Sequence, residues 1–415
     1  MTENHLARPT LYLTSRYPLT SQTFIRREVD ALRRLDVSVL TASIHRTSVD
    51  DVRGLGDAQA QASTWALFDV PKIIVLLRIL GVVLRGRSGL TRSVVWSTLG
   101  LDARRTALRI AYLLEAVAVK AYCERQGVRH VHVHFANNAA DVARYVVQLG
   151  NNRGQGELWS WSFTMHGPTE FFDTTKFDLA AKAADAAFVV CISDFARSQL
   201  MSVTLPDVWG RFHVVRCGVE PSDYQSVRTH DAASGSRATR ILCVGRLVPE
   251  KGQHLLLLAL AQIRSAGHVA TLSLVGDGPS RSSLESIAQD LGLGAAVTFR
   301  GAMSPEDVTE LYGCHDIFCL ASFAEGVPIV LMEAMASGLP VIATRIAGIS
   351  ELVTEKAGIL VNPGSVDQLA KALLVVGSDV GLRRSMGIVG RQLVKDGYNI
   401  NTNSELLATI FRTLR

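Results

Sequence analysis

The stretch Glu325–Glu333 constrains the fold of this chain most, because it joins a short apolar run to an apolar helical pattern that carries a carboxylate. Ile317–Leu320, just before it, predicts a buried strand, since the run is short and its side chains are large and apolar. Pro328 suits the first turn of a helix, where a missing N–H costs nothing. We therefore predict Glu325 in a strand-to-helix loop and Glu333 about two turns into the helix.

The predicted helix is apolar around nearly its whole circumference, which indicates burial. A buried carboxylate such as Glu333 is costly unless groups donate hydrogen bonds to it, and the hydroxyls of a sugar are such donors. The N–H groups of Gly326 and Val327, near the helix N-terminus, favour anionic oxygens. In the alternative interpretation, Glu333 pairs with a structural arginine and Glu325 only complements the helix dipole.

The composition bounds the class of protein. A length of 415 residues exceeds what one hydrophobic core usually supports, so two domains are expected. The net charge of +5 is too small to argue for nucleic acid as a partner. The six cysteines show no paired metal spacing, which favours free thiols of a cytosolic protein. Residues 1–9 lack a signal-peptide core, and the longest apolar run, 73–84, is too short to span a bilayer.

Residues 72–110 differ from the rest in charge, with eight basic side chains against one acidic side chain and aliphatic residues between them. A basic amphipathic helix can lie on an anionic membrane surface. The alternative is an ordinary helical insert with a solvated basic face. We favour the membrane surface because the charge bias is so one-sided.

Histidines mark two places in the first half. Val131–Phe135 alternates, so that His132 and His134 lie on one face of a predicted strand. Two ligands alone make a poor metal site, so core or cleft histidines are expected. His166 ends a later predicted strand and precedes Gly167, at the position where open α/β sheets bind ligands. We expect His166 to be functional, with a capping or packing role as the alternative.

The second half begins again with an apolar run, Ile241–Gly245, which predicts a buried strand. Arg246 and Lys251 follow in the loop before a helix and suit a diphosphate, with arginine as a fork and lysine as a point charge. The alternative is a surface loop that is basic by chance. Gly276 and Gly278 follow the next strand and permit close approach of a ligand, although the third glycine of the dinucleotide fingerprint is absent.

Several motifs occur in order along the second half. They are Gly245-Arg246 with Lys251-Gly252, Gly276-Asp277-Gly278-Pro279, Phe299-Arg300-Gly301 and the pair Glu325 and Glu333. With these motifs, residues 241–367 resemble the retaining nucleotide-sugar glycosyltransferases of family 4. The first half is similar, more loosely, to the branch that builds bacterial exopolysaccharides such as colanic acid. The residues behind that similarity are Tyr17-Pro18, Ser21–Ile25, His132–Phe135, Ser162–Gly167 and Arg216–Val219.

The resemblance implies an α/β protein with the GT-B fold, in which two Rossmann-like parallel-sheet domains face each other across a cleft. We expect an acceptor-binding domain at residues 1–218, including the basic segment 72–110. A nucleotide-sugar-binding domain is expected at residues 219–415, and its last helix is a candidate to cross back to the first domain.

The resemblance assigns the reacting centre to four side chains. Arg246 and Lys251 would hold the donor diphosphate, and Glu325 would contact the donor sugar. His166, from the other domain, would meet the sugar near the reacting carbon. One departure concerns the loop after the first strand, which reads Thr14–Pro18 where many members of the family have two glycines.

The rest of the donor site is also implied by the resemblance. Glu333 would bind the ribose hydroxyls, and the turn at Arg300 would meet the base. The backbone amides of Gly326 and Val327 would touch the sugar or the phosphate. The two glycines already noted, Gly276 and Gly278, complete the expected substrate-binding set.

Catalysis is expected without a metal or another cofactor. Negative charge develops on the leaving nucleoside diphosphate, and preorganised cations with helix N–H groups stabilise it. Many transferases hold a metal for this purpose with an Asp-x-Asp pair, and no two aspartates of this chain are two positions apart. The resemblance also implies retention of the anomeric configuration.

The leading prediction is sugar transfer from a nucleotide-sugar donor to a lipid-linked oligosaccharide acceptor, in bacterial exopolysaccharide synthesis. The enzyme would be cytoplasmic and peripheral at the inner face of the membrane, with an anionic membrane surface but no nucleic acid as a partner. Two alternatives stay open, a GT-B-like nucleotide-sugar epimerase and a non-catalytic protein that binds nucleotide sugars. A nicotinamide-dependent oxidoreductase is disfavoured by the incomplete glycine fingerprint.

Overall fold

The computed structural model describes residues 8–19, 22–48, 52, 54–69, 103–151, 158–224 and 238–414. Contacts divide the chain into two compact units. We call residues 1–192, 196–215 and 404–415 the N-terminal unit, and residues 193–195 and 216–403 the C-terminal unit. The N-terminal unit therefore includes the end of the last helix of the chain.

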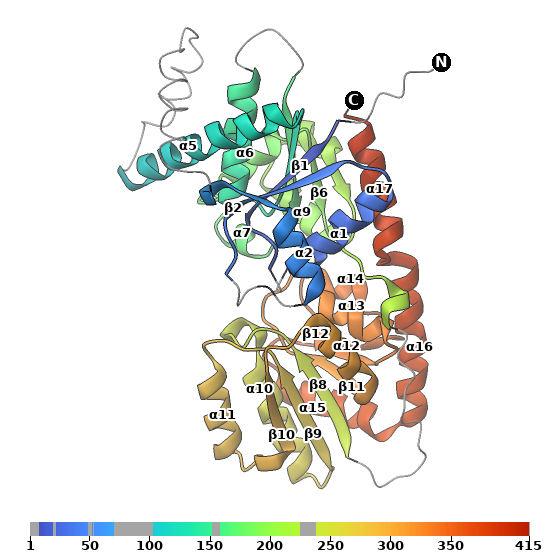
Figure 1. Cartoon of the computed structure of the whole chain (residues 1–415). Helices are drawn as coiled ribbons and strands as arrows, with labels where there is room; N and C mark the ends of the chain where they lie inside the picture. The colour runs from blue at the N-terminus through green and yellow to red at the C-terminus, as the bar shows by residue number, and fades with distance from the viewer. Residues whose placement is uncertain are drawn as a thin grey trace. The chain divides into compact units, whose positions relative to one another are not determined.

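A parallel sheet forms the centre of the N-terminal unit, and its seven described strands run in the order β3-β2-β1-β4-β5-β6-β7 (Figure 1). The strands are β1 (Thr10–Arg16), β2 (Val39–His45), β3 (Trp65–Ala66), β4 (His130–His134), β5 (Ser160–Met165), β6 (Phe188–Cys191) and β7 (Phe212–Val214). The chain runs from β1 to β2 on one side, and later to β4 on the other side. Ligands of open α/β sheets bind at the carboxyl ends of the strands at such a switch in strand order.

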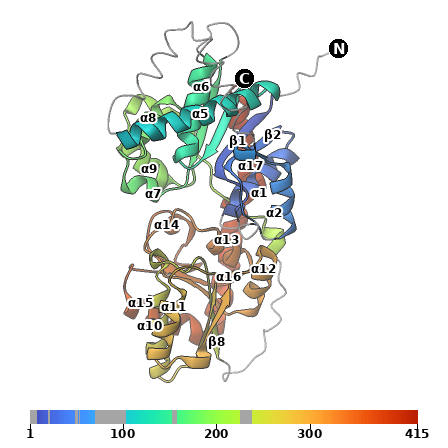
Figure 2. The same cartoon turned by 60° about the vertical axis from the view of Figure 1, so that its left-hand side comes forward.

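Helices cover both faces of this sheet. They are α1 (Thr23–Arg34), α2 (Leu55–Ser63), α5 (Ala103–Arg125), α6 (Asn138–Asn151), α7 (Thr169–Phe172), α8 (Leu179–Asp185), α9 (Asp194–Ser202) and α17 (Ile400–Arg412). One core lies under α5, α6 and α8, where Val142 and Ala183 are buried. The other lies under α1 and α17, where Tyr12, Leu32 and Phe411 pack together. Figure 2 shows α5 and α6 side by side on their face of the sheet.

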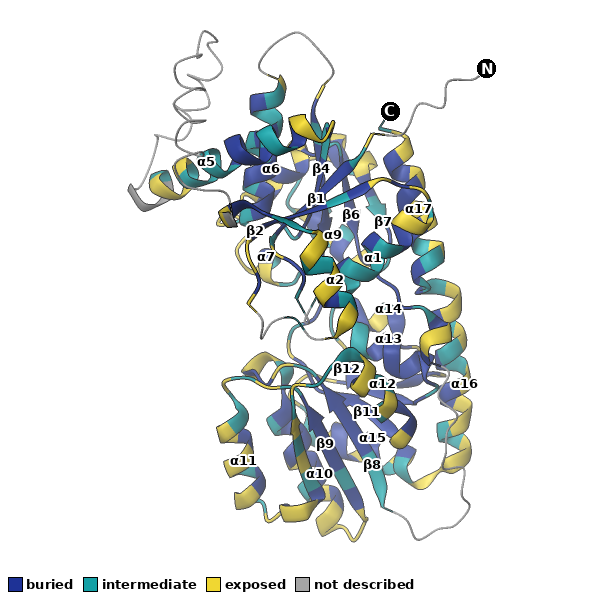
Figure 3. Ribbon diagram, in the orientation of Figure 1, coloured by how far each residue is buried: buried dark blue, intermediate teal, exposed yellow. Residues whose placement is uncertain are grey.

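The C-terminal unit repeats this architecture, with six strands among its described residues in the parallel order β10-β9-β8-β11-β12-β13. The strands are β8 (Thr239–Val244), β9 (Ala270–Val275), β10 (Val297–Gly301), β11 (Ile317–Leu320), β12 (Val341–Thr344) and β13 (Gly358–Val361). The helices are α10 (Gln253–Ser265), α11 (Arg281–Asp290), α12 (Pro305–Cys314), α13 (Ile329–Ala336), α14 (Ile349–Leu352), α15 (Val366–Ser378) and α16 (Val380–Gly397). Figure 3 shows the central strands of this sheet as buried, and the order of strands switches between β8 and β11.

The predicted α/β class with two Rossmann-like parallel sheets is confirmed. The predicted depth of Glu333 in its helix is wrong, because Pro328 is extended and only precedes the helix. Since α13 begins at Ile329, Glu333 is its fifth residue and lies just over one turn inside. Of the basic segment 72–110, residues 72–102 lie outside the described part of the chain, and residues 103–110 begin α5. No helix within the described ranges is both long and apolar enough to cross a bilayer.

Candidate active site

The loops after β8 and β11 lie together at the carboxyl edge of the C-terminal sheet. The backbone N–H of Phe323 donates to the carbonyl oxygen of Glu250 at 2.8 Å. Gly252 has a φ of +64°, and a Cβ there would meet the carbonyl oxygen of Ala321 at 2.1 Å, so that only glycine fits. These contacts lock the two loops at the switch in strand order. The predicted residues on them are Arg246, Lys251, Glu325, Gly326 and Val327.

Lys251 and Glu325 are in direct contact. The Nζ atom of Lys251 lies 2.5 Å from Oε1 of Glu325, and the hydroxyl of Ser322 donates to the same oxygen at 2.8 Å. Glu325 is only 8% exposed, so its charge needs such donors. An ammonium group has three donors, and the contact with one carboxylate oxygen therefore leaves capacity for phosphate oxygens.

Arg246 extends from the same loop as Lys251 and is exposed. Its carbonyl oxygen accepts a hydrogen bond of 2.8 Å from the side chain of Gln253, which is buried at the start of α10. Gln253 thus fixes the backbone that carries Arg246, and sequence reasoning missed it. The signal that could have found it is a polar side chain at the first position of an otherwise apolar helix.

The glycines after β9 have a structural reason that the sequence did not reveal. A Cβ on Gly276, which has a φ of +130°, would meet the carbonyl oxygen of Gly245 at 2.0 Å. A Cβ on Gly278 would meet the carbonyl oxygen of Leu247 at 2.4 Å. The close approach at both positions is therefore made by the backbone of the loop after β8. The two glycines shape the site by letting this loop lie against them.

Glu333 is buried, with 8% of its surface exposed, and two tyrosines donate to it. The hydroxyl of Tyr224 lies 3.0 Å from Oε1, and the hydroxyl of Tyr312 lies 2.8 Å from Oε2. Neither tyrosine was found from the sequence, because they stand 109 and 21 positions away from Glu333. Each carboxylate oxygen can accept two hydrogen bonds, and a sugar hydroxyl is a donor of the same kind as these phenols.

Arg300 lies at the end of β10, and its side chain is exposed. Its Nε atom lies 3.3 Å from the hydroxyl of Ser273, which also contacts the ring of His315 at 3.0 Å. Because β9 separates β10 from β8, the structure places Arg300 two strands away from the switch in strand order.

His166, the predicted residue of the N-terminal unit, follows β5 and is buried. Its Nε2 atom lies 2.8 Å from Nδ1 of His134. Burial, with a smaller contribution from His134, holds the pKa of His166 well below the usual 6.5, so the ring is neutral at physiological pH. The expectation that His132 and His134 are core or cleft histidines is confirmed, since they are 0% and 1% exposed.

Hydroxyl side chains of β5 bind the other histidines of β4. His130 contacts Ser160 and Ser162, both at 2.8 Å, and His132 contacts Ser162 at 2.7 Å and Thr164 at 3.0 Å. Burial lowers the pKa of His130 to about 3 and lowers that of His132 well below 6.5.

A possible metal-ligand set occurs in the same place. One atom each of Glu28, His132 and His134 lie within 4.8 Å of one another. Both ring nitrogens of His132 are engaged by hydroxyls, however, and Nδ1 of His134 is engaged by His166. A metal ion would have to displace a hydroxyl from His132, and we therefore assign no metal to the set.

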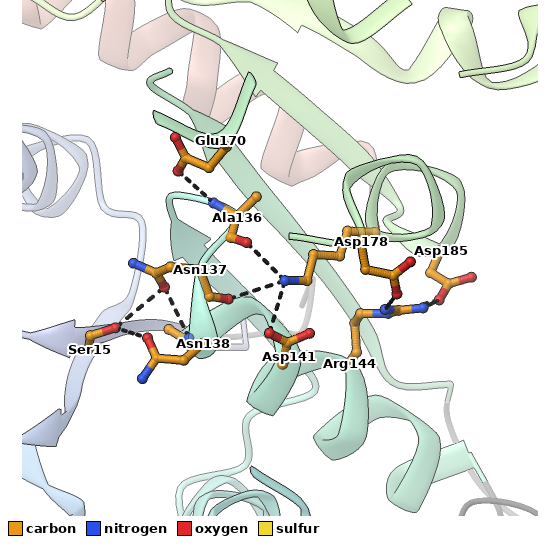
Figure 4. Close-up of polar contacts among 11 residues, drawn as sticks. Ser15, Ala136, Asn137, Asn138, Asp141, Arg144, Glu170, Asp178 and Asp185 are labelled. Atoms are coloured by element: carbon orange, nitrogen blue, oxygen red, sulfur yellow. Dashed lines mark hydrogen bonds and ion pairs between the residues drawn. The ribbon is translucent and has the colours of Figure 1, made fainter. Parts of the chain in front are cut away.

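The loop between β4 and α6 is held from both sides, as Figure 4 shows. The Nζ atom of the buried Lys182 donates to the carbonyl oxygen of Ala136 at 2.8 Å. The N–H of Ala136 donates to the buried carboxylate of Glu170 at 3.2 Å. Ser15, at the end of β1, contacts the side chains of Asn137 and Asn138. Polar side chains thus gather at the switch in strand order of this unit as well, and sequence reasoning missed them.

The comparison with protein families decides the identity of the second half. Residues 230–393 match the family model described as "Glycosyl transferases group 1". This part of the chain is similar to the group 1 glycosyl transferases. Every predicted site residue of the C-terminal unit lies inside the matched range, and His166 lies outside it. The expected resemblance to glycosyltransferases is thereby confirmed for residues 230–393.

Curated relatives of this chain are named as transferases of different sugars. The "GDP-mannose-dependent alpha-(1-6)-phosphatidylinositol monomannoside mannosyltransferase" of Mycobacterium tuberculosis strain H37Rv is 35% identical over 186 residues, 43% of this chain and 48% of the relative. The "Alpha-D-kanosaminyltransferase" of Streptomyces kanamyceticus is 27% identical over 312 residues, 71% of this chain and 77% of the relative. The chain spans about half the length of the mannosyltransferases that it matches.

Solved structures show the same fold as this chain. The sucrose-phosphate synthase of Thermosynechococcus elongatus has a TM-score of 0.74 at 22% identity, covering 98% of this chain and 99% of that one. Anabaena HepE in complex with UDP-glucose has a TM-score of 0.70 at 18% identity, covering 98% and 99% of the two chains. The expected GT-B fold is confirmed.

Proposed function

We propose that the chain transfers a sugar from a nucleotide-sugar donor to a lipid-linked acceptor. The observation that carries this proposal is the contact of Lys251 with Glu325 at the switch in strand order of the group 1 unit. A cation and a carboxylate side by side match the two halves of a sugar diphosphate, because phosphate needs positive charge and sugar hydroxyls need an acceptor.

Binding of the donor would replace the contact between Lys251 and Glu325 with contacts from each residue to the donor. Phosphate oxygens would draw the ammonium of Lys251 away from Glu325, and Glu325 would then accept hydrogen bonds from the sugar hydroxyls. Arg246 and the amides of Gly326 and Val327 would add donors to the diphosphate as charge develops on it. The pair would therefore be a resting state of the site that donor binding opens.

The remaining site residues keep the roles that the resemblance gives them. Glu333, fixed by its two tyrosines, would bind the ribose hydroxyls, and Arg300 would meet the base. His166 would contact the sugar near the reacting carbon. Transfer would retain the anomeric configuration by attack on the face from which the nucleotide leaves. The cations would make a metal unnecessary, so activity should survive a chelator, and complete loss with rescue by Mg²⁺ would refute this part.

A lipid-linked acceptor is supported by two observations. The mannosyltransferase relatives are named for phosphatidylinositol mannosides, which are lipids. The basic segment 72–110 has the composition of a helix that lies on anionic membranes. Within this class we favour the lipid-linked oligosaccharides of bacterial exopolysaccharide synthesis, at the inner face of the cytoplasmic membrane, as the resemblance of the first half suggests.

Membrane contact can be tested separately from catalysis. Replacing Arg85, Arg87, Arg104 and Arg105 with glutamine should weaken pelleting with vesicles that contain anionic lipid. Pelleting with neutral vesicles, and donor hydrolysis in solution, should stay unchanged. Equal pelleting of wild type and variant with anionic vesicles would remove the membrane surface from the proposal.

A donor panel tests the transfer itself. Purified protein is screened against UDP-, GDP- and dTDP-sugars by thermal shift, since a bound donor raises apparent stability. The donor that binds is then incubated with a lipid-linked acceptor, and a new glycolipid is expected. An epimerised donor without acceptor would support the epimerase, and binding without any turnover would support a non-catalytic protein.

A further inference from the structure

Three side chains from three elements of the N-terminal unit, Glu28, His134 and His166, form a line of polar contacts. Oε1 of Glu28, on α1, lies 3.3 Å from Nε2 of His134, on β4. Nδ1 of His134 in turn lies 2.8 Å from Nε2 of His166, after β5. The side chain of Glu28 is 12% exposed and that of His134 is 0% exposed.

The carboxylate determines which ring atoms carry protons. An ionised carboxylate can only accept, and a neutral imidazole has one N–H and one lone pair. A lone pair of His134 Nε2 facing the oxygen of Glu28 would be repelled, so this nitrogen carries the proton. Nδ1 of His134 is then the acceptor, and Nε2 of His166 must donate to it. His166 is thereby left with its proton on Nε2 and none on Nδ1.

Packing holds the three groups in this arrangement. The hydroxyl of Tyr12 donates to Oε1 of Glu28 at 2.8 Å, which fixes the carboxylate. The rings of Phe24 and Phe135 each lie with their centroids 4.6 Å from that of His166. The contact between Glu28 and His134 is too long and too poorly aligned to count as a hydrogen bond here. Such contacts often tighten when substrate binds.

We propose that Glu28 is a positioning residue, which acts through His134 to hold His166 in one orientation and in the tautomer protonated on Nε2. Any group that meets Nδ1 of His166 must then be a donor, as a sugar hydroxyl is. This inference deepens the proposed function, because it rests on His166 contacting the donor sugar.

The neighbouring histidines provide an internal comparison. The ring nitrogens of His130 and His132 contact the hydroxyls of Ser160, Ser162 and Thr164. A hydroxyl can donate or accept, so no carboxylate fixes the tautomers of these two rings. Removing Glu28 should therefore alter the tautomer of His134 and His166 and leave those of His130 and His132 as they were.

The test uses full-length protein labelled with ¹⁵N in histidine, because protonated and unprotonated ring nitrogens resonate in separate ranges. His166→Ala and His134→Ala spectra assign the signals. In wild type, His166 should show the proton on Nε2 alone. Glu28→Ala should give a mixture of both tautomers, and Glu28→Gln, whose amide oxygen can still accept, should restore the wild-type pattern. An unchanged His166 signal in Glu28→Ala would overturn the proposal.

Kinetics provide the second readout. Glu28→Ala should lower kcat about tenfold with little change in the KM for donor, and Glu28→Gln should recover most of it. The loss is smaller than when a triad loses its orienting carboxylate, because His166 is not required to move a proton. Asp30→Ala, on the same helix, is the matched control and should keep wild-type kcat. A Gln variant as slow as the Ala variant would contradict the tautomer argument.

The two readouts separate this inference from the proposed function. Thermal unfolding of each variant first establishes that it is folded, and the Gln variant keeps the test valid if the Ala variant is unstable. A tautomer shift in a protein without transfer activity would refute the proposed function and support the role of Glu28. Transfer activity with no tautomer shift would refute the role of Glu28 alone.

Discussion

The sheets of the two units have the same switch in strand order, yet their centres differ in chemistry. In the C-terminal unit, the central strands bury apolar side chains such as Ile241, Ile317 and Ile342. In the N-terminal unit, β4 and β5 bury a row of hydrogen-bonded histidines and hydroxyls. The same fold therefore carries its polar groups in two different places.

This difference shows how function is distributed on a common architecture. The C-terminal unit keeps an apolar core and places its chemistry on loops at the sheet edge, where Lys251 meets Glu325. The N-terminal unit extends its polar network from the edge, at His166, into the sheet itself. A buried polar network specifies one arrangement when it is satisfied, and it makes the unit sensitive to protonation.

Lowering the pH should destabilise the N-terminal unit, and this is the largest effect that the contrast between the two units predicts. Burial lowers the pKa of His130 to about 3 and those of His132 and His166 well below 6.5. Between pH 6.5 and these pKa values, the unfolded chain binds more protons than the folded chain. The stability that these neutral histidines contribute is therefore fully present above pH 6.5 and is lost as the pH falls. Each histidine removes about 1.4 kcal/mol of unfolding free energy per pH unit.

Three carboxyls among the described residues of the same unit oppose this loss, because burial raises the pKa values of Glu115, Asp141 and Glu170. Burial raises the pKa of Glu115 to about 7, so the folded state takes up its proton first and gains stability as the pH falls from 7 toward 4.5. After these offsets we expect the free energy of unfolding of the N-terminal unit to fall by about 2 kcal/mol between pH 6 and pH 5. The Glu115→Gln variant should lose more, and His130→Gln should lose less.

Urea unfolding followed by tryptophan fluorescence measures this loss selectively. Four of the five tryptophans of the chain, at positions 65, 159, 161 and 209, lie among the described residues of the N-terminal unit, and the fifth is at position 96. Glu115→Gln and His130→Gln provide the two controls of opposite sign. An unfolding free energy that stays constant from pH 6 to pH 5 in wild type would mean that the buried histidines do not set the stability of this unit.

Removing the cation of the C-terminal site should have the next largest effect. Lys251→Ala should lower kcat/KM for sugar transfer about 100-fold, because no ammonium then stabilises the leaving diphosphate. Glu250→Ala, at the exposed neighbouring position, should stay near wild type and serves as the control. The measurement is the initial rate over a range of donor concentrations. Equal rates for Lys251→Ala and wild type would exclude the lysine from the diphosphate site.

A smaller effect is expected at Glu333. Tyr224→Phe and Tyr312→Phe each remove one donor to a buried carboxylate, which costs about 1 kcal/mol per bond. The Kd for the nucleotide, measured by calorimetry, should rise about fivefold in each variant. Tyr112→Phe, in the other unit, should bind as wild type does. Unchanged affinity in both Tyr224→Phe and Tyr312→Phe would argue that the carboxylate of Glu333 is structural.

The predictable part of the site consists of residues that lie close in sequence to a strand end. Arg246, Lys251 and Glu325 each follow an apolar run, so their loop positions could be inferred from the pattern. The contact between Lys251 and Glu325 could not, because the two residues are 74 positions apart and meet only through the pairing of β8 with β11.

The sequence also did not predict residues that act through other residues, because their partners are distant in the sequence. Glu28 stands in an amphipathic helix among charged neighbours and looks like a surface residue until β4 is placed beside it. Tyr224 precedes a polar stretch and gives no sign of its distant carboxylate. The fold itself was predictable, since short apolar runs alternate with helical patterns along both halves.

The central claim is that the loops after β8 and β11 form one nucleotide-sugar site. Hydrogen–deuterium exchange with and without the donor selected by the thermal-shift panel tests this most directly. The account predicts slower exchange in peptides that cover 245–252 and 322–333 of the wild type, and no such change in Lys251→Ala at the same donor concentration. Slower exchange elsewhere in the C-terminal unit, with both of these peptides unaffected at saturating donor, would contradict it.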